Sequence, residues 1–249
     1  MKHSIHALAT ALLLLCLSVP AAQANVVIGG TRVVFPAQDG EVTVRLTNNN
    51  KTPALVEAWI DSGDEHSTPD KVNTPFLITP PIFRMDPHKD QSLRILYTQN
   101  KQPLPTDRES LFWLNVLEIP PKPSGKAFAG KNLLQFAIRS RLKLFYRPAH
   151  LAGDPAKAPS LVTWTSVPDG QGYALEVHNP TPYHVTIVQA TITVGGKSYV
   201  SDSGMVDPFG KLDLKVKNLA TAPASGTPVT YDIVNDYGAT TPLKGSVAP

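Results

Sequence analysis

The sequence predicts an all-β protein built from two immunoglobulin-like β-sandwiches. Its apolar residues occur in short runs, many of them at every second position, which is the period of an extended strand. The 24 prolines lie mostly in pairs or beside turn residues between these runs. No stretch keeps a helical period for more than a turn or two, and nothing resembles a heptad.

The first 24 residues have the pattern of a secretory signal peptide. Lys2 supplies the positive start, residues 7–19 the apolar core, and residues 22–24 (Ala-Gln-Ala) a cleavage site flanked by small residues. The apolar core is shorter than the roughly 20 residues of a membrane-spanning helix. We therefore expect a mature chain that begins at Asn25 and is exported rather than embedded in the membrane.

Removal of this segment leaves 225 of the 249 residues and no cysteine, because the single cysteine is Cys16. Small exported domains often depend on disulfides, so this chain must be held by packing alone. Loss of Lys2 lowers the formal net charge from +3 to +2, which does not favour a nucleic acid or another bulk polyanion as partner. The length suits two domains of about 110 residues, or one large one.

The first half of the mature chain contains seven strand candidates, the number in an immunoglobulin-like sandwich. Gly29 and Gly30 interrupt the first and predict a bend or a switch between sheets. Pro80 and Pro81 break the fourth into two pieces, and one of their peptide bonds is a candidate for the cis form. Trp59, in the third, is predicted to fill the core. The candidates are residues 26–35, 41–47, 53–61, 76–85, 92–97, 105–120 and 133–145.

After Pro148 the composition changes to small residues and prolines, which predicts a domain boundary. We expect an N-terminal domain at residues 25–148 and a C-terminal domain at 149–249. A second series of short strand candidates follows, with a glycine hairpin at 195–196. These candidates are residues 161–164, 173–179, 185–194, 197–200, 212–216, 229–235 and 243–247.

The last strand candidate of the first domain has two different faces. Leu134, Phe136 and Ile138 share one face, which continues at residues 142 and 144, and the other face carries Arg139, Arg141 and Lys143. At about 13 residues it is longer than the usual 5 or 6. Either part of it serves something other than its own sheet, or it is one long central strand.

Motifs for catalysis or metal binding are absent from the sequence. There is no G-x-S-x-G, no H-E-x-x-H, no phosphate-binding glycine loop and no mature cysteine nucleophile. The acidic loop 61–66 lacks the spacing of a calcium loop, which favours a plain solvated loop. His178 and His184 are better explained as surface or packed histidines than as a metal pair. We expect no enzyme activity, no cofactor and no metal.

Seven motifs, in this order and across nearly the whole mature chain, resemble the PapD-like periplasmic pilus chaperones of the chaperone–usher pathway. They are TRVVF (31–35), TPP (79–81), DRESLFW (107–113), EIPP (118–121), KLFYRP (143–148), NPTPY (179–183) and NDYG (235–238). The resemblance implies two immunoglobulin-like domains in a boomerang arrangement. It also implies a location in the periplasm.

The resemblance implies that the protein folds, stabilises and caps pilin subunits by lending them a strand. Pilins lack a final strand, and these chaperones insert their G1 strand into the gap, which is donor-strand complementation. Here that strand corresponds to residues 133–145, and Leu134, Phe136 and Ile138 match the groove-filling residues. The capped subunit is then delivered to an outer-membrane usher. The exposed strand of the free protein is also available for self-association.

Arg32 and Lys143 match the two family cations that bind the C-terminal carboxylate of the subunit. Without the resemblance, Arg32 indicates only a solvent-facing strand residue. Arg139 and Arg141 have the parity of Lys143, so only the KLFYRP motif selects it. Since Lys143 has the opposite parity to Ile138, a bend, or a cleft reached from the other side, is needed.

Glu109, Arg147 and Asp236 match the family's internal salt-bridge positions and predict a buried ionic network between the domains. The 13-residue connection 120–132 and the lack of a mature cysteine resemble the class with a short F1–G1 loop. A secreted two-domain adhesin or binding module is the alternative, since it would share the signal peptide and the sandwiches. It would not need Arg32 and Lys143 to converge on a carboxylate.

Overall fold

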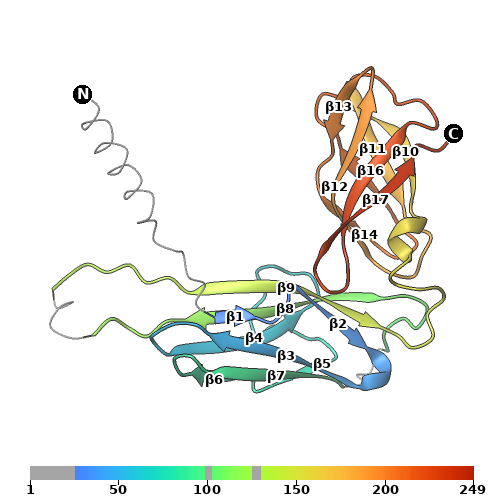
Figure 1. The fold of residues 1–249 in the computed structure, drawn as a ribbon. Coiled ribbons are helices and arrows are strands. Elements are labelled where there is room, and N and C mark those ends of the chain that lie inside the picture. Colours follow the sequence, from blue (N-terminus) through green and yellow to red (C-terminus); the bar gives the residue numbers. More distant parts are fainter. Residues whose placement is uncertain (1–25, 99–102, 125–129) are drawn as a thin grey trace, which may run out of the picture.

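The computed structural model describes residues 26–98, 103–124 and 130–249, which form two β-sandwiches set at an angle to each other (Figure 1). The predicted signal peptide and its cleavage site lie outside these residues. Apart from the 3-10 turns η1 (Ala37–Asp39) and η2 (Ala158–Leu161), the regular structure described is all strand. No helix in this part of the chain is long and apolar enough to cross a membrane. The all-β prediction with two sandwiches is confirmed.

The N-terminal sandwich consists of a four-stranded and a five-stranded sheet. The first has the order β1 (Val26–Ile28), β3 (Glu41–Asn48), β7 (Asp90–Tyr97), β5 (Phe76–Thr79). The second has the order β2 (Arg32–Pro36), β9 (Ile138–Arg147), β8 (Ser110–Ile119), β4 (Ala54–Asp61), β6 (Ile82–Met85). Their facing side chains form one core, which includes the fully buried Phe35, Leu46, Val56, Leu93 and Leu144.

Two interruptions predicted from the sequence carry the chain from one sheet to the other. Gly29 and Gly30 separate β1 from β2, and Gly30 has a φ of 150° that favours glycine. The diproline separates β5 from β6, and its Thr79–Pro80 bond is cis, as anticipated. The first switch matters for the site, because it places β2 parallel to β9 with Arg32 opposite Lys143.

The C-terminal sandwich has a three-stranded sheet and a five-stranded sheet around Trp164, Leu175 and Ile187. The three-stranded sheet has the order β10 (Thr163–Asp169), β11 (Gly172–His178), β15 (Lys211–Lys215). The five-stranded sheet has the order β13 (Lys197–Val200), β12 (Val185–Val194), β16 (Pro228–Val234), β17 (Thr240–Ser246), and its fifth strand, β14 (Gly204–Val206), pairs with β12. The sequence missed β14, which has only three residues. It also began β10 too early, because η2 occupies the residues up to Leu161.

The predicted strand 133–145 is wrong at both ends, since β9 begins at Ile138 and ends at Arg147. Its ladder with β8 stops where Ile138 lies opposite Glu118. Pro120 and Pro121 directly follow the end of β8, and a proline has no N–H to donate to a ladder. Residues 133–137 therefore lack a neighbouring strand in the described structure.

Trp59 does not fill the sandwich core, contrary to the prediction. Its neighbours Ala58 and Ile60 belong to the core, so alternation turns the indole to the opposite face. There it is nevertheless buried, and its Nε1 donates a hydrogen bond to Ser67 Oγ at 3.2 Å. We call this side of the β2–β9–β8–β4–β6 sheet, turned away from its own core, the outer face.

Candidate functional site

The segment that leads into β9 exposes a row of large apolar side chains. Leu134, Phe136 and Ile138 are 79%, 68% and 52% exposed. By alternation they lie on the face that continues as the buried Leu142 and Leu144. We call residues 133–138 the apolar arm; it leads into β9 at one end of the sandwich (Figure 1). Such a contiguous exposed row is typical of a surface that a partner covers.

The edge of β9 next to the arm is also open. β8 pairs with β9 from Ile138 to Tyr146, but β2 pairs only with the part that begins at Lys143. Residues 138–142 therefore have one unpaired edge among the described residues. A free edge of this kind accepts another strand, and here it lies in line with the start of β2.

Arg32 and Lys143 lie side by side at the point where this free edge ends. They are directly opposite in the parallel register, and both point to the outer face, because Val33 and Leu144 enter the core. The Arg32 guanidinium lies 5.5 Å from the ring centre of Phe145, and its Nη1 donates to the Val234 carbonyl at 3.0 Å. Arg32 Nε is buried without a hydrogen-bond partner in the described structure.

Neither cation has an acidic side chain within 4.0 Å among the described residues. Burial lowers the pKa of Lys143, and the nearby charge of Arg32 lowers it further. Burial also lowers the pKa of Arg32, an effect that the more distant Asp236 and Glu109 oppose without cancelling. Two half-buried positive charges without an ion-pair partner in the described structure are suited to bind an anion.

The geometry distinguishes Lys143 from the other two cations of β9. Arg141 is paired with the buried Asp61, at 2.6 Å between Nη2 and Oδ1, and stacks 4.1 Å from the ring centre of Trp113. Arg139 donates to the backbone carbonyl of Glu65. The sequence assigned Asp61 to a solvated loop and did not foresee its pairing with Arg141.

The opposite parity of Lys143 and Ile138 is explained by a cleft on the outer face. The C-terminal domain packs there, with the ring of His184 5.3 Å from that of Phe145. Lys143 lies on the same face as Phe145, the side on which the C-terminal domain packs, while Ile138 faces the other way. Of the two options left open by the sequence, the structure shows the cleft reached from the other side.

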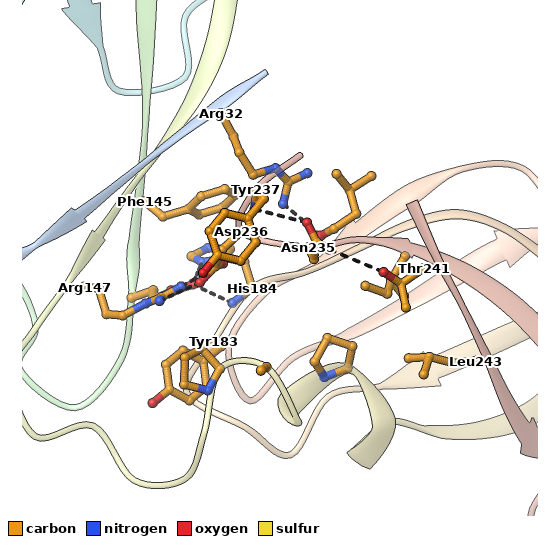
Figure 2. Close-up of a pocket in the computed structure, with 16 residues that line it drawn as sticks. Arg32, Phe145, Arg147, Tyr183, His184, Asn235, Asp236, Tyr237, Thr241 and Leu243 are labelled. Atoms are coloured by element: carbon orange, nitrogen blue, oxygen red, sulfur yellow. Dashed lines mark hydrogen bonds and ion pairs between the residues drawn. The ribbon is translucent and has the colours of Figure 1, made fainter. Parts of the chain in front are cut away.

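The structure brings Glu109, Arg147 and Asp236 together between the domains (Figure 2). Arg147 Nε donates to Glu109 Oε1 at 2.7 Å, and its two terminal nitrogens donate to Asp236 at 2.8 and 3.0 Å. Burial alone would lower the pKa of Arg147, but these partners raise it above the ordinary value. Its charge is satisfied, in contrast to those of Arg32 and Lys143.

His184 belongs to the same cluster, which sequence reasoning missed. Its backbone N–H donates to Glu109 Oε2 at 2.8 Å, and its Nδ1 lies 3.1 Å from the same oxygen. Its side chain is buried. The one available signal was its place directly after the NPTPY turn, which Asn179 shapes through its side-chain bond to the Tyr183 carbonyl.

A cavity of about 430 Å³ lies between the domains beside these residues. The N-terminal domain contributes Arg32, Phe145 and Arg147 to its wall, and the C-terminal domain contributes Ile233, Tyr237 and Leu243, among others (Figure 2). In the described part of the chain, no three metal-ligating side chains come together.

Comparison with known proteins places both domains in one family. The model described as "Pili and flagellar-assembly chaperone, PapD N-terminal domain" matches residues 25–152, and "Pili assembly chaperone PapD, C-terminal domain" matches 157–245. The chain is 42% identical over 231 residues to the chaperone protein FimB/FhaD of Bordetella pertussis, which covers 92% of this chain and 91% of the relative.

Solved structures agree with this result. The YadV chaperone structure superposes with a TM-score of 0.75 at 38% identity, covering 90% of this chain and all of the other. The SafB chaperone of Salmonella enterica, solved in complex with the SafA pilin, gives a TM-score of 0.71 at 28% identity, covering 92% and 99%. The chain therefore belongs to the PapD family of pilus chaperones, which assist pilus subunits and are not enzymes.

Proposed function

We propose that the protein binds a pilin by donating its apolar arm and β9 edge to the subunit, and anchors the subunit's C-terminal carboxylate on Arg32 and Lys143. The observation that carries this proposal is the pair of half-buried, unneutralised cations at the end of a free strand edge. We refer to the two residues as the carboxylate anchor. The family assignment decides against the adhesin alternative.

The direction of the incoming strand follows from the topology. A strand added to residues 138–142 lies in line with β2, which starts at Arg32 and runs parallel to β9. If the added strand is also parallel, its C-terminal end arrives beside Arg32 and Lys143. An antiparallel strand would bring an N-terminal ammonium to the same two cations, which is repulsive. The charges therefore favour a parallel strand that ends in a carboxylate.

The anchor and the apolar arm work together through register. Leu134, Phe136 and Ile138 lie about 6.6 Å apart along an extended chain and present one face. Each contributes roughly 1.5 to 3 kcal/mol when buried in the subunit. A slip of one residue would turn the apolar side chains of the arm away from the core of the subunit, so a fixed end point selects the productive register.

The wider pathway follows from the family and the arm. A chaperone that holds an unfinished subunit must hand it on, which supports transfer to an outer-membrane usher. The predicted signal peptide supports a periplasmic location. The connection 120–132 supports the class with a short F1–G1 loop. The SafB relative, solved with a bound pilin, supports the pilin as partner.

The test is a binding titration with the cognate pilin. Wild-type protein and Lys143→Ala are each titrated with the pilin ending in its natural carboxylate and with the same pilin ending in a carboxamide. We expect tight binding only for wild type with the acid. The amide should bind Lys143→Ala no more weakly than it binds wild type, because both changes remove one interaction.

Two controls complete the titration. Circular dichroism of Lys143→Ala should match that of wild type, since Lys143 lies outside the core. Arg32→Ala should lose affinity, and the double variant should be little worse than either single one. Fully additive losses, or an amidated pilin that binds as tightly as the acid, would remove Arg32 and Lys143 from the anchor.

A further inference from the structure

The turn between β16 and β17, residues 235–239, presents the most exposed large side chain among the apolar and aromatic residues described. Tyr237 is 93% exposed. The turn beneath it is nevertheless well braced. Asn235 Oδ1 accepts hydrogen bonds from the backbone N–H groups of Tyr237 and Ala239 at 3.1 and 3.0 Å, and Gly238 N donates to the Asn235 carbonyl at 2.9 Å.

The same turn is fastened to the N-terminal domain on both sides of Tyr237. Asp236 forms the two-pronged ion pair with Arg147. Gly238 has a φ of +81° and lies so close to Thr31 that a Cβ there would come within 2.2 Å of its hydroxyl oxygen. Only glycine fits this position, so the turn is pressed directly against the residue that precedes Arg32.

Val234, immediately before the turn, extends this contact to the carboxylate anchor. Its carbonyl accepts the hydrogen bond from Arg32 Nη1 at 3.0 Å. The C-terminal domain thus helps to orient a guanidinium that belongs to the N-terminal domain. Tyr237, Arg32 and Phe145 all line the cavity between the domains (Figure 2).

We propose that the β16–β17 turn is a second subunit-binding element, in which Tyr237 packs against the last residues of the pilin while the Val234 carbonyl holds Arg32 in place. This inference rests on the proposed function. An exposed aromatic ring on a rigid support loses little conformational freedom on binding, which is why tyrosine is common among the residues that dominate interfaces. Ile233 and Leu243 in the cavity wall favour an apolar side chain next to the carboxylate.

The experiment compares Tyr237→Ala with Tyr237→Phe in titrations with the same pilin. We expect Tyr237→Ala to weaken binding about thirtyfold or more, the usual effect of truncating a dominant interface residue. Tyr237→Phe, which keeps the ring, should restore most of the affinity. Phe209→Ala is the matched control, because Phe209 is an exposed aromatic of the same domain that does not line the cleft cavity.

Binding in the Arg32→Ala background distinguishes a contact at the anchor from a remote effect. If Tyr237 contacts the last pilin residues, which Arg32 binds, then Tyr237→Ala should reduce pilin affinity by a smaller factor in the Arg32→Ala background than in wild type. Wild-type affinity for Tyr237→Ala, with affinity lost in Ile138→Glu and Lys143→Ala, would overturn this inference alone. Normal binding by all three variants would overturn the proposed function itself.

Discussion

Replacing Glu109 with alanine should be the most damaging single change in the ionic network between the domains. The Glu109 side chain is only 2% exposed, whereas that of Asp236 is 40% exposed. Glu109 accepts bonds from Arg147 Nε and from the backbone N–H of His184. Water cannot readily replace these bonds in the variant, but it can replace much of what Asp236 provides.

The magnitude follows from burial. Removing one partner of a buried ion pair costs about 3 to 5 kcal/mol, which includes leaving the His184 N–H unpaired at about 1 to 3 kcal/mol. At about 2 to 4 °C per kcal/mol for a chain of this size, the midpoint of thermal unfolding of Glu109→Ala should lie roughly 6 to 20 °C below that of wild type. Asp236→Ala should cost only about 1 kcal/mol, because exposed pairs contribute little.

Thermal unfolding followed by circular dichroism at neutral pH checks this order. Asp64→Ala serves as the control, because Asp64 is an exposed loop residue without an ion pair among the described residues. We expect the midpoints to decrease in the order Asp64→Ala, Asp236→Ala, Glu109→Ala. A Glu109→Ala midpoint equal to that of the control would refute the reasoning.

Three further results are expected. Ile138→Glu should abolish pilin capture in co-purification while leaving the fold intact by circular dichroism, because the side chain is exposed before binding and a buried glutamate is costly; normal yields would contradict the strand donation. Affinity for the pilin carboxylate should fall as pH rises toward 10.5, because the lowered pKa of Lys143 makes the ammonium lose its proton below the usual pH and the anchor needs that positive charge. A binding affinity that stays constant up to pH 10.5 would count against the role of Lys143 in the anchor. Burial raises the pKa of Asp61, but hydrogen bonds from Arg141, Asn115 and the Gly63 N–H lower it overall, so the contribution of Asp61 to folding stability is full above pH 3.8 and is lost as pH falls through its pKa in the folded state. The difference in free energy of unfolding between wild type and Asp61→Asn, measured in urea, should therefore become smaller as pH falls below 3.8, and a constant difference would speak against the pairing with Arg141.

The strands with clear alternation could be predicted closely, because each face of a sandwich sheet has one environment. β3 and β12 match their predicted ranges to within a residue. β9 did not, because residues 133–137 have the apolar pattern of a strand but no neighbouring strand in the described structure. Under the proposed function, their partner strand belongs to the pilin. Periodicity shows which face a residue occupies, but a ladder forms only where a neighbouring strand supplies the matching N–H and C=O groups.

Residues on the outer face were the hardest to interpret. Alternation correctly turned Arg32 and Lys143 away from the core, but it implied exposure to solvent. For Arg32, part of its surroundings comes from the C-terminal domain, and the Val234 carbonyl that it contacts lies 202 residues away in sequence. Trp59 was misjudged for the same reason, since its cover is the loop that carries Ser67.

The sequence motifs predicted some residues of the interdomain ionic network and not others. Glu109, Arg147 and Asp236 were named from the family pattern, and the structure brings them into contact. His184 was expected to be a surface or packed histidine, and its place in the network was missed, because its role lies mainly in a backbone N–H that no side-chain pattern reports.

The arrangement of β9 links subunit binding to the angle between the domains. Lys143 and Arg147 are four residues apart on one face of one strand, so a single rigid element sets both the anchor and the interdomain ion pairs. Arg32 is oriented from the other side, by the Val234 carbonyl of the C-terminal domain. A rotation of that domain would therefore release the guanidinium of Arg32, one of the two proposed ligands of the carboxylate, and leave Lys143 unaffected. If Arg32 and Lys143 hold the subunit carboxylate as proposed, they can do so at a fixed end point only while the domain angle is maintained, and the network at Glu109 would then serve register as well as stability.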